Sequence, residues 1–428
     1  MKNYSILFII SLFATYIHAQ DSNAGAKINS PDQQYRRSSL HLMMIDDPER
    51  PMSVTIKKSF TVQPVPEKFN DHSLSLKSFP VDKLSVVPAY DLLDQINKNN
   101  LGREAVAKWF SRNASTGTLN MNLVAERGFY NASDLDVKKA KASKRGMSTI
   151  GDAGEELIKN TFLVVCDFKY INKEELGTGV AIGFKLAGDI AAAATGNKNL
   201  SKAGDVAAVA AVVASKGYIV KTTVFLYQLV WNDSVSAVFY NDLWNDESAP
   251  DAGRKAKFEN SNLFQYKYVG TATSYADVQS TIFTNKSEEE LIAMATKNAT
   301  ESALVKLEKS YETFRTKTPL YSVKPLRAKI GLKEGLKGNQ RYFVYEKRLN
   351  DEGKTVYKKV ASIRVKCGSV YDNQFVATGD PVDVNKLTRF YQTTGRRLMP
   401  GMLIQQRLDR GFFKPFNVFF GQFGRMFH

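Results

Sequence analysis

The sequence predicts an α+β protein with two folded parts, a helix-containing α/β module and a small C-terminal β-barrel. Three observations predict this class. Runs of β-branched and aromatic residues at Thr161–Ile171 and Tyr218–Trp231 are typical of strands. A capped amphipathic helix is predicted at Ser287–Phe314. The chain beyond it alternates apolar with charged residues in short segments, as the strands of a small barrel do.

The first 19 residues have the pattern of an export signal. Lys2 precedes an apolar run from Ile6 to Ile17, and the small residue Ala19 precedes an expected cut before Gln20. The run is short for a membrane span, although a signal anchor remains the alternative. We therefore expect an exported protein, located in the periplasm, at the cell surface or in association with the outer membrane.

Residues 20–80 predict an extended arm, because prolines interrupt any long element. Two strand-like pieces of this arm, Ser39–Ile45 and Ser53–Val62, could pair with the folded body. Residues 81–150 predict a helical region and a basic linker. Apolar residues recur at helical spacing between residues 88 and 112, and Gly102 is expected to separate or bend two helices.

Residues 151–318 predict the α/β module, with a mixed or antiparallel sheet. A helix near residues 151–160 leads into the first strand. Tyr218–Trp231 and Ser234–Leu243 predict a hairpin that turns at Asn232-Asp233. A third strand is expected near Leu263–Thr273. The capping box Ser287-Glu288-Glu289-Glu290 then begins the long helix, and Pro319 and Pro325 mark its exit.

A segment rich in small apolar residues, 177–215, lies between the first two strands. It predicts two helices that charged residues interrupt, and neither has the ~20 apolar residues of a membrane span. These helices are expected to pack on the sheet, with insertion or self-association on assembly as the alternative. The glycines at 177, 179 and 183 do not fit the dinucleotide fingerprint, because the third comes one place late.

Residues 319–411 predict a basic β-barrel of five or six short strands, closed so that no edge is bare. Gln340–Leu349 and Lys354–Cys367 flank a turn at Asn350–Gly353 and alternate apolar with charged residues. The further strands are expected at Ala328–Leu332, Asp372–Ala377 and Met402–Arg407.

Nearly all of the excess positive charge lies at this end. Residues 315–428 hold 23 Lys and Arg against 8 Asp and Glu, whereas residues 20–314 hold 35 of each sign. Basic side chains on one face would attract phosphates, uronates or lipid headgroups, although an ordinary solvated face remains the alternative. The expected anion-binding residues are Arg341, Lys347, Arg348, Lys358, Lys359, Arg364, Lys366, Arg396 and Arg397, and Arg407 and Arg410 follow them in the chain.

Residues 412–428 form a Phe-rich tail. Its rings recur at helical intervals with basic companions, although Gly421 and Gly424 weaken a helix. Burial on the parent fold and docking to a partner or a membrane interface both remain open. The docking residues on the second reading are Phe412, Phe416, Phe419, Phe420, Phe423 and Phe427.

Catalytic and metal-binding residue types are scarce. Of the four histidines, His41 and His72 lie in the predicted arm and the other two lie near the chain ends, so residues 80–411 have none. This argues against Ser-His or Cys-His nucleophiles and histidine-rich zinc sites. Cys166 and Cys367 could pair or remain two free thiols. No cofactor or metal is expected.

One acidic cluster carries the oxygen ligands that calcium prefers, but its spacing does not match the twelve-residue calcium loop. We interpret it as the solvated end of a hairpin, with a calcium site as the alternative. Its members are Asp242, Asn245, Asp246, Glu247 and Asp251.

The order of strand, strand, capped helix and basic barrel resembles the periplasmic modules of the curli-secretion lipoprotein and flagellar T-ring families. Gly395-Arg396-Arg397-Leu398-Met399-Pro400-Gly401-Met402 is similar to the closing strand of the T-ring protein's SH3-like end. The resemblance covers residues 151–411 and implies an SH3-like β-barrel and a structural role without catalytic residues. The lipobox cysteine of the curli family is missing here.

Two functions follow from these patterns. The first is a non-enzymatic, exported cell-envelope protein that binds or scaffolds through its basic barrel and aromatic tail. Its partner would be an anionic envelope polymer, lipid headgroups or another protein, with peripheral membrane contact and oligomer formation both open. Export argues against nucleic acid. The alternative function is a carboxylate-dependent hydrolase of anionic envelope glycans, although nothing in the sequence selects a pair of carboxylates.

Overall fold

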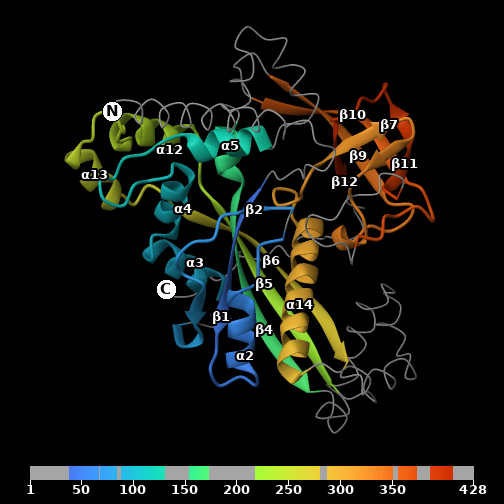
Figure 1. Ribbon diagram of the computed structural model, residues 1–428, viewed down its shortest axis with the longest axis horizontal. Helices are drawn as coiled ribbons and strands as arrows, with labels where there is room; N and C mark the ends of the chain where they lie inside the picture. The colour runs from blue at the N-terminus through green and yellow to red at the C-terminus, as the bar shows by residue number, and fades with distance from the viewer. Residues whose placement is uncertain are drawn as a thin grey trace, which may run out of the picture.

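The computed structural model describes residues 38–66, 68–83, 88–130, 154–172, 217–279, 287–349, 355–373 and 386–407. Within these residues, seven α-helices and two β-sheets confirm the α+β class (Figure 1). Several predictions fall outside them: the signal peptide, the basic stretch near residue 140, the segment 177–215, the turn at 350–353, most of the strand at 372–377, and the tail 412–428.

The larger sheet has six strands in the order β2-β1-β4-β5-β6, and β3 also pairs with β1. β1 runs parallel to β2, β3 and β4, whereas β4, β5 and β6 are antiparallel. The sheet is therefore mixed. Its strands are β1 (Ser39–Asp46), β2 (Asn70–Asp71), β3 (Ser78–Pro80), β4 (Thr161–Asn172), β5 (Gly217–Leu229) and β6 (Tyr266–Gln279).

Helices cover both faces of this sheet, because its central strands are apolar on both sides. In β4, Phe162 and Val164 belong to one hydrophobic cluster and Leu163 and Val165 to the other. The first cluster includes residues of α2 (Ser53–Thr61) and α14 (Glu288–Ser310). The helices of the second face are α3 (Pro88–Lys98), α4 (Leu101–Trp109), α5 (Asn122–Tyr130), α12 (Asp233–Val238) and α13 (Ala252–Glu259).

The predicted arm is part of the folded core. Its first strand-like piece is β1, which lies inside the sheet and pairs with β4 over six residues. The second piece, Ser53–Val62, was predicted to be a strand and is the helix α2, which buries Ile56 and Phe60. The prediction failed because the alternation of apolar residues there also fits one helical face. His41 and His72 consequently lie inside the body that was expected to hold no histidine.

The predicted hairpin between β5 and residues 234–243 is wrong. Those residues form α12 and a π-helical turn, Phe239–Leu243, while β5 pairs with β4 and β6. The side chain of Asn232 accepts a hydrogen bond from the Val235 N–H at 3.0 Å and so begins the helix instead of a turn. Phe239 then packs against Phe110 with ring centroids 4.6 Å apart, and this contact stabilises the helical conformation.

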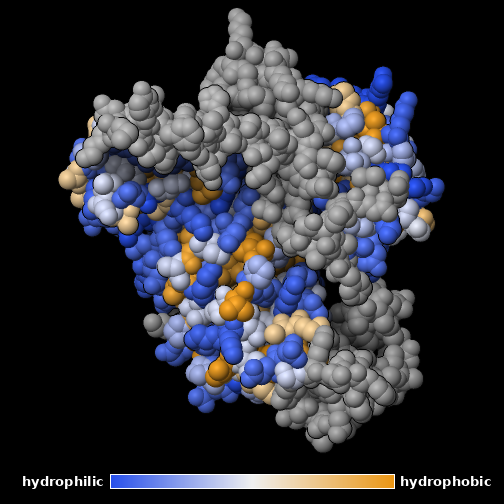
Figure 2. All heavy atoms as spheres, viewed as in Figure 1, coloured by the Kyte–Doolittle hydropathy of each residue, from blue (hydrophilic) through white to orange (hydrophobic). Residues whose placement is uncertain are grey.

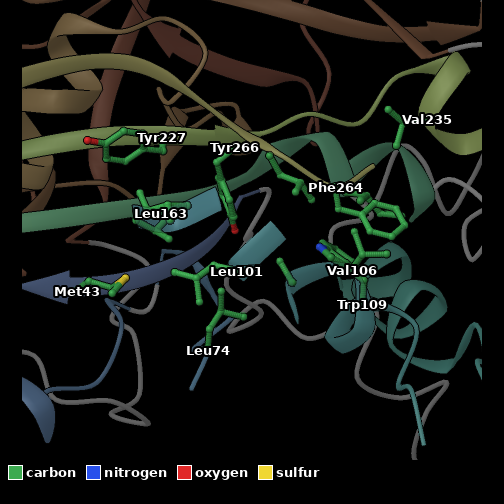
Figure 3. Packing of buried hydrophobic residues seen from close by; sticks show 14 of the residues in the cluster. Met43, Leu74, Leu101, Val106, Trp109, Leu163, Tyr227, Val235, Phe264 and Tyr266 are labelled. Atoms are coloured by element: carbon green, nitrogen blue, oxygen red, sulfur yellow. The ribbon is translucent and has the colours of Figure 1, made fainter. Parts of the chain in front are cut away.

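The helices α3 and α4 lie where the spacing predicted, but they separate at Asn100 and not at Gly102. Asn100 has φ 56°, a left-handed conformation that asparagine tolerates. Gly102 is inside α4, where an added Cβ would lie 2.2 Å from the Phe264 carbonyl oxygen. The glycine is needed for this close approach. Figure 3 shows Val106 and Trp109 of the same helix packed in the core below the sheet.

Side chains pair with the open edge of β6. The Asn97 amide accepts from the Tyr266 N–H at 2.9 Å and donates to the Tyr266 carbonyl at 3.3 Å. The Tyr311 hydroxyl accepts from the Thr271 N–H at 2.7 Å and donates to the Thr271 carbonyl at 2.8 Å. The Tyr311 ring lies over Gly270. These contacts satisfy backbone groups that would otherwise invite another strand.

The second sheet is a closed ring of six strands in the order β10-β11-β8-β7-β12-β9. Side chains such as Leu320, Val344, Ile363 and Ile404 fill its interior. Hydrophilic residues predominate on the side of the ring seen in Figure 2. The strands are β7 (Thr318–Val323), β8 (Leu326–Ala328), β9 (Arg341–Leu349), β10 (Thr355–Val365), β11 (Thr388–Gly395) and β12 (Leu403–Gln406).

Candidate functional site

Strand alternation divides the residues of β9 between the inside and the outside of the ring. Tyr342 and Val344 are buried in the ring core, whereas Arg341 is exposed and Phe343 is half-buried on the outer side. The same alternation holds at the end of β10, where Ile363 is buried between two outward residues. The outer face of the ring therefore carries polar, charged and aromatic side chains of the described residues.

Three arginines lie side by side across this face, and we call Arg407, Arg341 and Arg364 the arginine ladder. The Arg407 N–H donates to the Arg341 carbonyl at 2.8 Å, and Arg341 is directly opposite Arg364 in the β9–β10 pair. Tyr391 is in turn opposite Arg364 and is 45% exposed. Residues in direct cross-strand register project from the same face about 5 Å apart.

The ladder costs the fold some stability. Like charges directly opposite one another on a sheet repel, and no carboxylate of the described residues makes an ion pair with Arg341, Arg364 or Arg407. Arg364 donates instead to the neutral Asn339 side chain at 3.0 Å. An external anion would therefore gain attraction from several guanidinium groups at once.

A hollow of about 590 Å³ adjoins the ladder, between the ring and the exit of α14. Arg315, Lys359 and Arg407 bring three positive charges to its lining, and Glu312 is the one carboxylate among the lining residues. Ser362, Gln405 and Gln406 add neutral polar groups to the lining. The hollow therefore presents a positive, hydrogen-bonding surface.

The rings of Phe343 and Tyr345 form the aromatic floor of the hollow, and Phe343 contacts two of the cations that line it. The Lys359 ammonium lies 3.6 Å from the centroid of Phe343, and the Arg407 guanidinium lies 5.6 Å from it. Tyr345 packs edge-on against the same ring at 6.5 Å. Cation–π contacts of this kind orient a charge without neutralising it, so the two cations remain able to bind an anion.

Arg315 ties the hollow to the helical module. Its Nε donates to the Glu308 carbonyl and one terminal nitrogen donates to the Gln406 carbonyl, both at 3.0 Å. Its other terminal nitrogen is buried and has no hydrogen-bond partner among the residues that the structure describes. Burial lowers the pKa of this guanidinium, an effect that nearby Glu312 opposes. The sequence patterns did not single out Arg315, because it lies in the helix exit and not in a strand.

The nine predicted anion-binding residues do not form one surface. Arg341, Lys359 and Arg364 lie on the outer face with the ladder and hollow, and Lys347 follows them in the same alternation. Arg348 and Arg396 instead form ion pairs with Glu346, and Lys358 is directly opposite that carboxylate. Lys366 and Arg397 are exposed just beyond the ends of β10 and β11. The six docking phenylalanines of the tail lie outside the described residues.

The acidic cluster at 242–251 organises its own loop. Asp246 accepts from the Ser248 N–H at 2.8 Å, Asn245 accepts from the Asp251 N–H at 2.7 Å, and Asp251 caps α13. Hydrogen bonds from Ser248 lower the pKa of Asp246. In the described part of the chain, no group of three or more His, Cys, Asp or Glu residues is placed to hold a metal ion.

The buried side chain of His72 forms a polar network with Arg127, which is 6% exposed, and His41 is buried as well. The Arg127 guanidinium donates to Ser39 Oγ and to His72 Nδ1, each at 2.9 Å, and lies 4.3 Å from the Trp109 ring. These groups join β1, α4 and α5 inside the core, so we assign them a structural role. Cys166 is buried and Cys367 exposed, and both are free thiols.

No known family matches the chain, and no curated protein is similar to it. Among the described residues, none of the helices has the length and apolar character required to cross a membrane.

Proposed function

We propose that this protein is a non-enzymatic, exported cell-envelope protein that binds an anionic polymer through the outer face of its ring. The observation that carries the proposal is the arginine ladder. Arg341 and Arg364 are directly opposite one another, Arg407 just beyond β12 is hydrogen-bonded to the Arg341 backbone, and none of the three has a carboxylate partner among the described residues. Such an arrangement opposes folding by repulsion and favours binding of an anion by the same charges.

The hollow supports binding more than hydrolysis. Glycoside hydrolases commonly use two carboxyl groups on either side of the scissile bond, and Glu312 is the one carboxylate among the residues that line the hollow. Apart from Phe343, the remaining lining residues can donate hydrogen bonds or carry positive charge. They are suited to holding an anion, which a scaffold needs.

The resemblance to envelope proteins supports the same role. Gly395–Met402 connects β11 to β12, the strand that closes the ring, and Leu398 and Met402 contribute to the ring core. We propose that the ring is an SH3-like barrel of the kind found in T-ring proteins. In this proposal the ring is the attachment module and the α/β module displays it.

A binding experiment with matched charge variants tests the proposal. The full chain and the triple variant Arg341→Ala, Arg364→Ala, Arg407→Ala are titrated with polygalacturonate, polyphosphate and anionic vesicles at low and high salt. Each exposed arginine should contribute about 0.5–1 kcal/mol to the free energy of binding. Loss of all three should therefore weaken binding of the polymer roughly tenfold to hundredfold. Added salt should weaken the unsubstituted chain in the same direction, because it screens exposed charges.

The control variant removes the same amount of charge from the helical module. Lys58, Lys257 and Lys267 are exposed residues of α2, α13 and β6, and their replacement by alanine should leave the affinity within about twofold, because charges beyond a Debye length contribute little. Equal losses in the two triple variants would show that net charge, and not the ladder, controls binding. Failure of all three anionic probes to bind would refute the proposed function.

A further inference from the structure

We infer that the bound polymer is an acidic polysaccharide, which lies across β12, β9, β10 and β11 with its acid groups on the arginine ladder and a sugar ring against Tyr391. This inference rests on the proposed function and specifies its ligand. Three features of the outer face carry it: the linear order of the cations, the exposed aromatic residue at their end, and the neutral polar groups beside them.

The cations form a line that crosses the strands. Neighbouring strands are about 4.8 Å apart, so the ladder repeats its positive charge at a short and regular interval from Arg407 to Arg364. A linear polymer with an acid group on successive sugars offers a comparable repeat of negative charge. An isolated phosphate or a single headgroup would occupy one step of the ladder and leave the remaining arginines repelling one another.

The line ends at an aromatic platform. Tyr391 is directly opposite Arg364, so both side chains project from the same face, and the tyrosine is 45% exposed. The face of an aromatic ring carries partial negative charge, whereas the C–H groups on the face of a sugar carry partial positive charge. A pyranose ring can therefore stack on Tyr391 while its neighbour places a carboxylate on Arg364.

The hollow at the other end offers partners for hydroxyl groups. Ser362 is directly opposite Phe343 on the outer face and lines the hollow together with Gln405. These neutral groups alternate with the cations Lys359 and Arg407 around the aromatic floor. A ligand that carries hydroxyl and acid groups together can use both the donor and the acceptor atoms of these neutral side chains, whereas polyphosphate, which accepts hydrogen bonds, can use the donors alone.

A membrane surface fits this face less well. Peripheral insertion needs a continuous apolar surface beside the basic residues. The outer residues of β9 and β10 in the hollow are instead Lys359 and Ser362, together with aromatic rings that the cations cover. Tyr391 is the large exposed aromatic beside the ladder. The surface of the ring is thus suited to a solvated polymer.

The experiment compares four probes on the full chain: polygalacturonate, the same polymer with its carboxylates methyl-esterified, inorganic polyphosphate, and phosphatidylcholine vesicles that contain phosphatidylglycerol. Titration calorimetry measures each affinity. Polygalacturonate should bind most tightly, and esterification should abolish binding because the ladder then meets no charge. Tyr391→Ala should lower the affinity for polygalacturonate by up to about tenfold and leave polyphosphate unchanged, whereas Tyr391→Phe should retain the affinity.

Each outcome decides the inference. Equal binding of polyphosphate and polygalacturonate, with no effect of Tyr391→Ala, would overturn the polysaccharide and leave the proposed anion-binding function intact. Preferential binding of vesicles would overturn it in favour of lipid headgroups. Failure of every anionic probe would overturn both. Because Tyr391 is exposed, its variants are expected to fold, and a thermal unfolding curve for each variant confirms that a lost affinity reflects lost contact.

Discussion

Acid should destabilise this protein strongly between pH 7 and pH 5, because two buried histidines are held neutral. His41 Nε2 is 2.8 Å from the Leu76 carbonyl, and its Nδ1 accepts from the Leu74 N–H at 3.1 Å. His72 Nε2 is 2.9 Å from the Ala105 carbonyl, and its Nδ1 accepts from Arg127. Each Nδ1 is already an acceptor, so a second proton has no place to bind without breaking a hydrogen bond.

The surrounding charges act in the same direction. Burial, and then the nearby Lys77 ammonium, lower the pKa of His41 to about 3. Burial, and then the Arg127 guanidinium, lower the pKa of His72 well below its ordinary value. Lys108 adds a further positive charge near both rings, and Asp71 is the carboxylate that partly offsets these charges at His41.

The sign and size of the effect follow from linkage. The folded state keeps both histidines neutral, whereas the unfolded chain binds protons with a pKa of about 6.5, so stability is fully present above that pH and is lost as the pH falls. Between pH 7 and pH 5 the loss is about 2 kcal/mol for each histidine and about 4 kcal/mol for the pair. This is a large share of the roughly 5–15 kcal/mol that stabilises a typical domain.

Urea unfolding at pH 7, 6 and 5, followed by circular dichroism, measures this loss. The double variant His41→Gln, His72→Gln will be less stable at pH 7, but its free energy of unfolding should change much less between pH 7 and pH 5. The carboxyl of Asp71, with its pKa lowered below the ordinary value, titrates under more acidic conditions than this window. A flat pH dependence in the unsubstituted protein, or an equal slope in the double variant, would refute the reasoning.

Three further changes have expected outcomes. Tyr311→Phe removes both hydrogen bonds to the β6 edge and should cost about 2 kcal/mol in urea unfolding, with more aggregation by light scattering because the edge is uncovered. Gly102→Ala drives a methyl group into the Phe264 carbonyl and should cost about 3 kcal/mol. Gly253→Ala, where the added Cβ meets only the exposed Asp251 carboxylate at 3.1 Å, should change the free energy of unfolding much less in the same assay. Deletion of residues 412–428 should release the protein from the envelope fraction, and unchanged fractionation would refute the docking tail.

The sequence predicts correctly those helices and strands whose capping residues or residue composition are typical of one type of element alone. The capping box at Ser287 and Glu290 is present in α14 as predicted, and the strand pattern at Thr161–Ile171 is β4. The pattern of β1 predicts a strand, but the prolines on either side of it predict an extended arm. Neither signal indicates that both faces of this strand are buried. Asn232 was interpreted as a turn residue, although asparagine also caps helices, and tertiary packing of Phe239 decided between the two.

The candidate site could be predicted as a basic strand pair but not as a surface. A β-bulge between Lys359 and Ala361 shifts the register of β10 against β9. Simple alternation would place Lys359 on the face opposite Arg364, and the bulge brings the two to the same side. Sequence periodicity does not locate a bulge. The position of Lys359 on the same face as the ladder, and that of Arg315 in the lining of the hollow, could therefore be seen only in the structure.

Neighbouring arginines lie close together at both ends of the β9–β10 pair, but a carboxylate offsets their repulsion at one end alone among the described residues. At one end, Arg348 and Arg396 share the carboxylate of Glu346, which offsets their mutual repulsion within the fold. At the other end, Arg341 and Arg364 lie opposite one another with no carboxylate partner among the described residues. Because both arrangements occur on one strand pair, basic composition alone does not explain the ladder. The described residues leave these cations without a carboxylate beside a hollow, which supports the proposal that an anion binds there from outside.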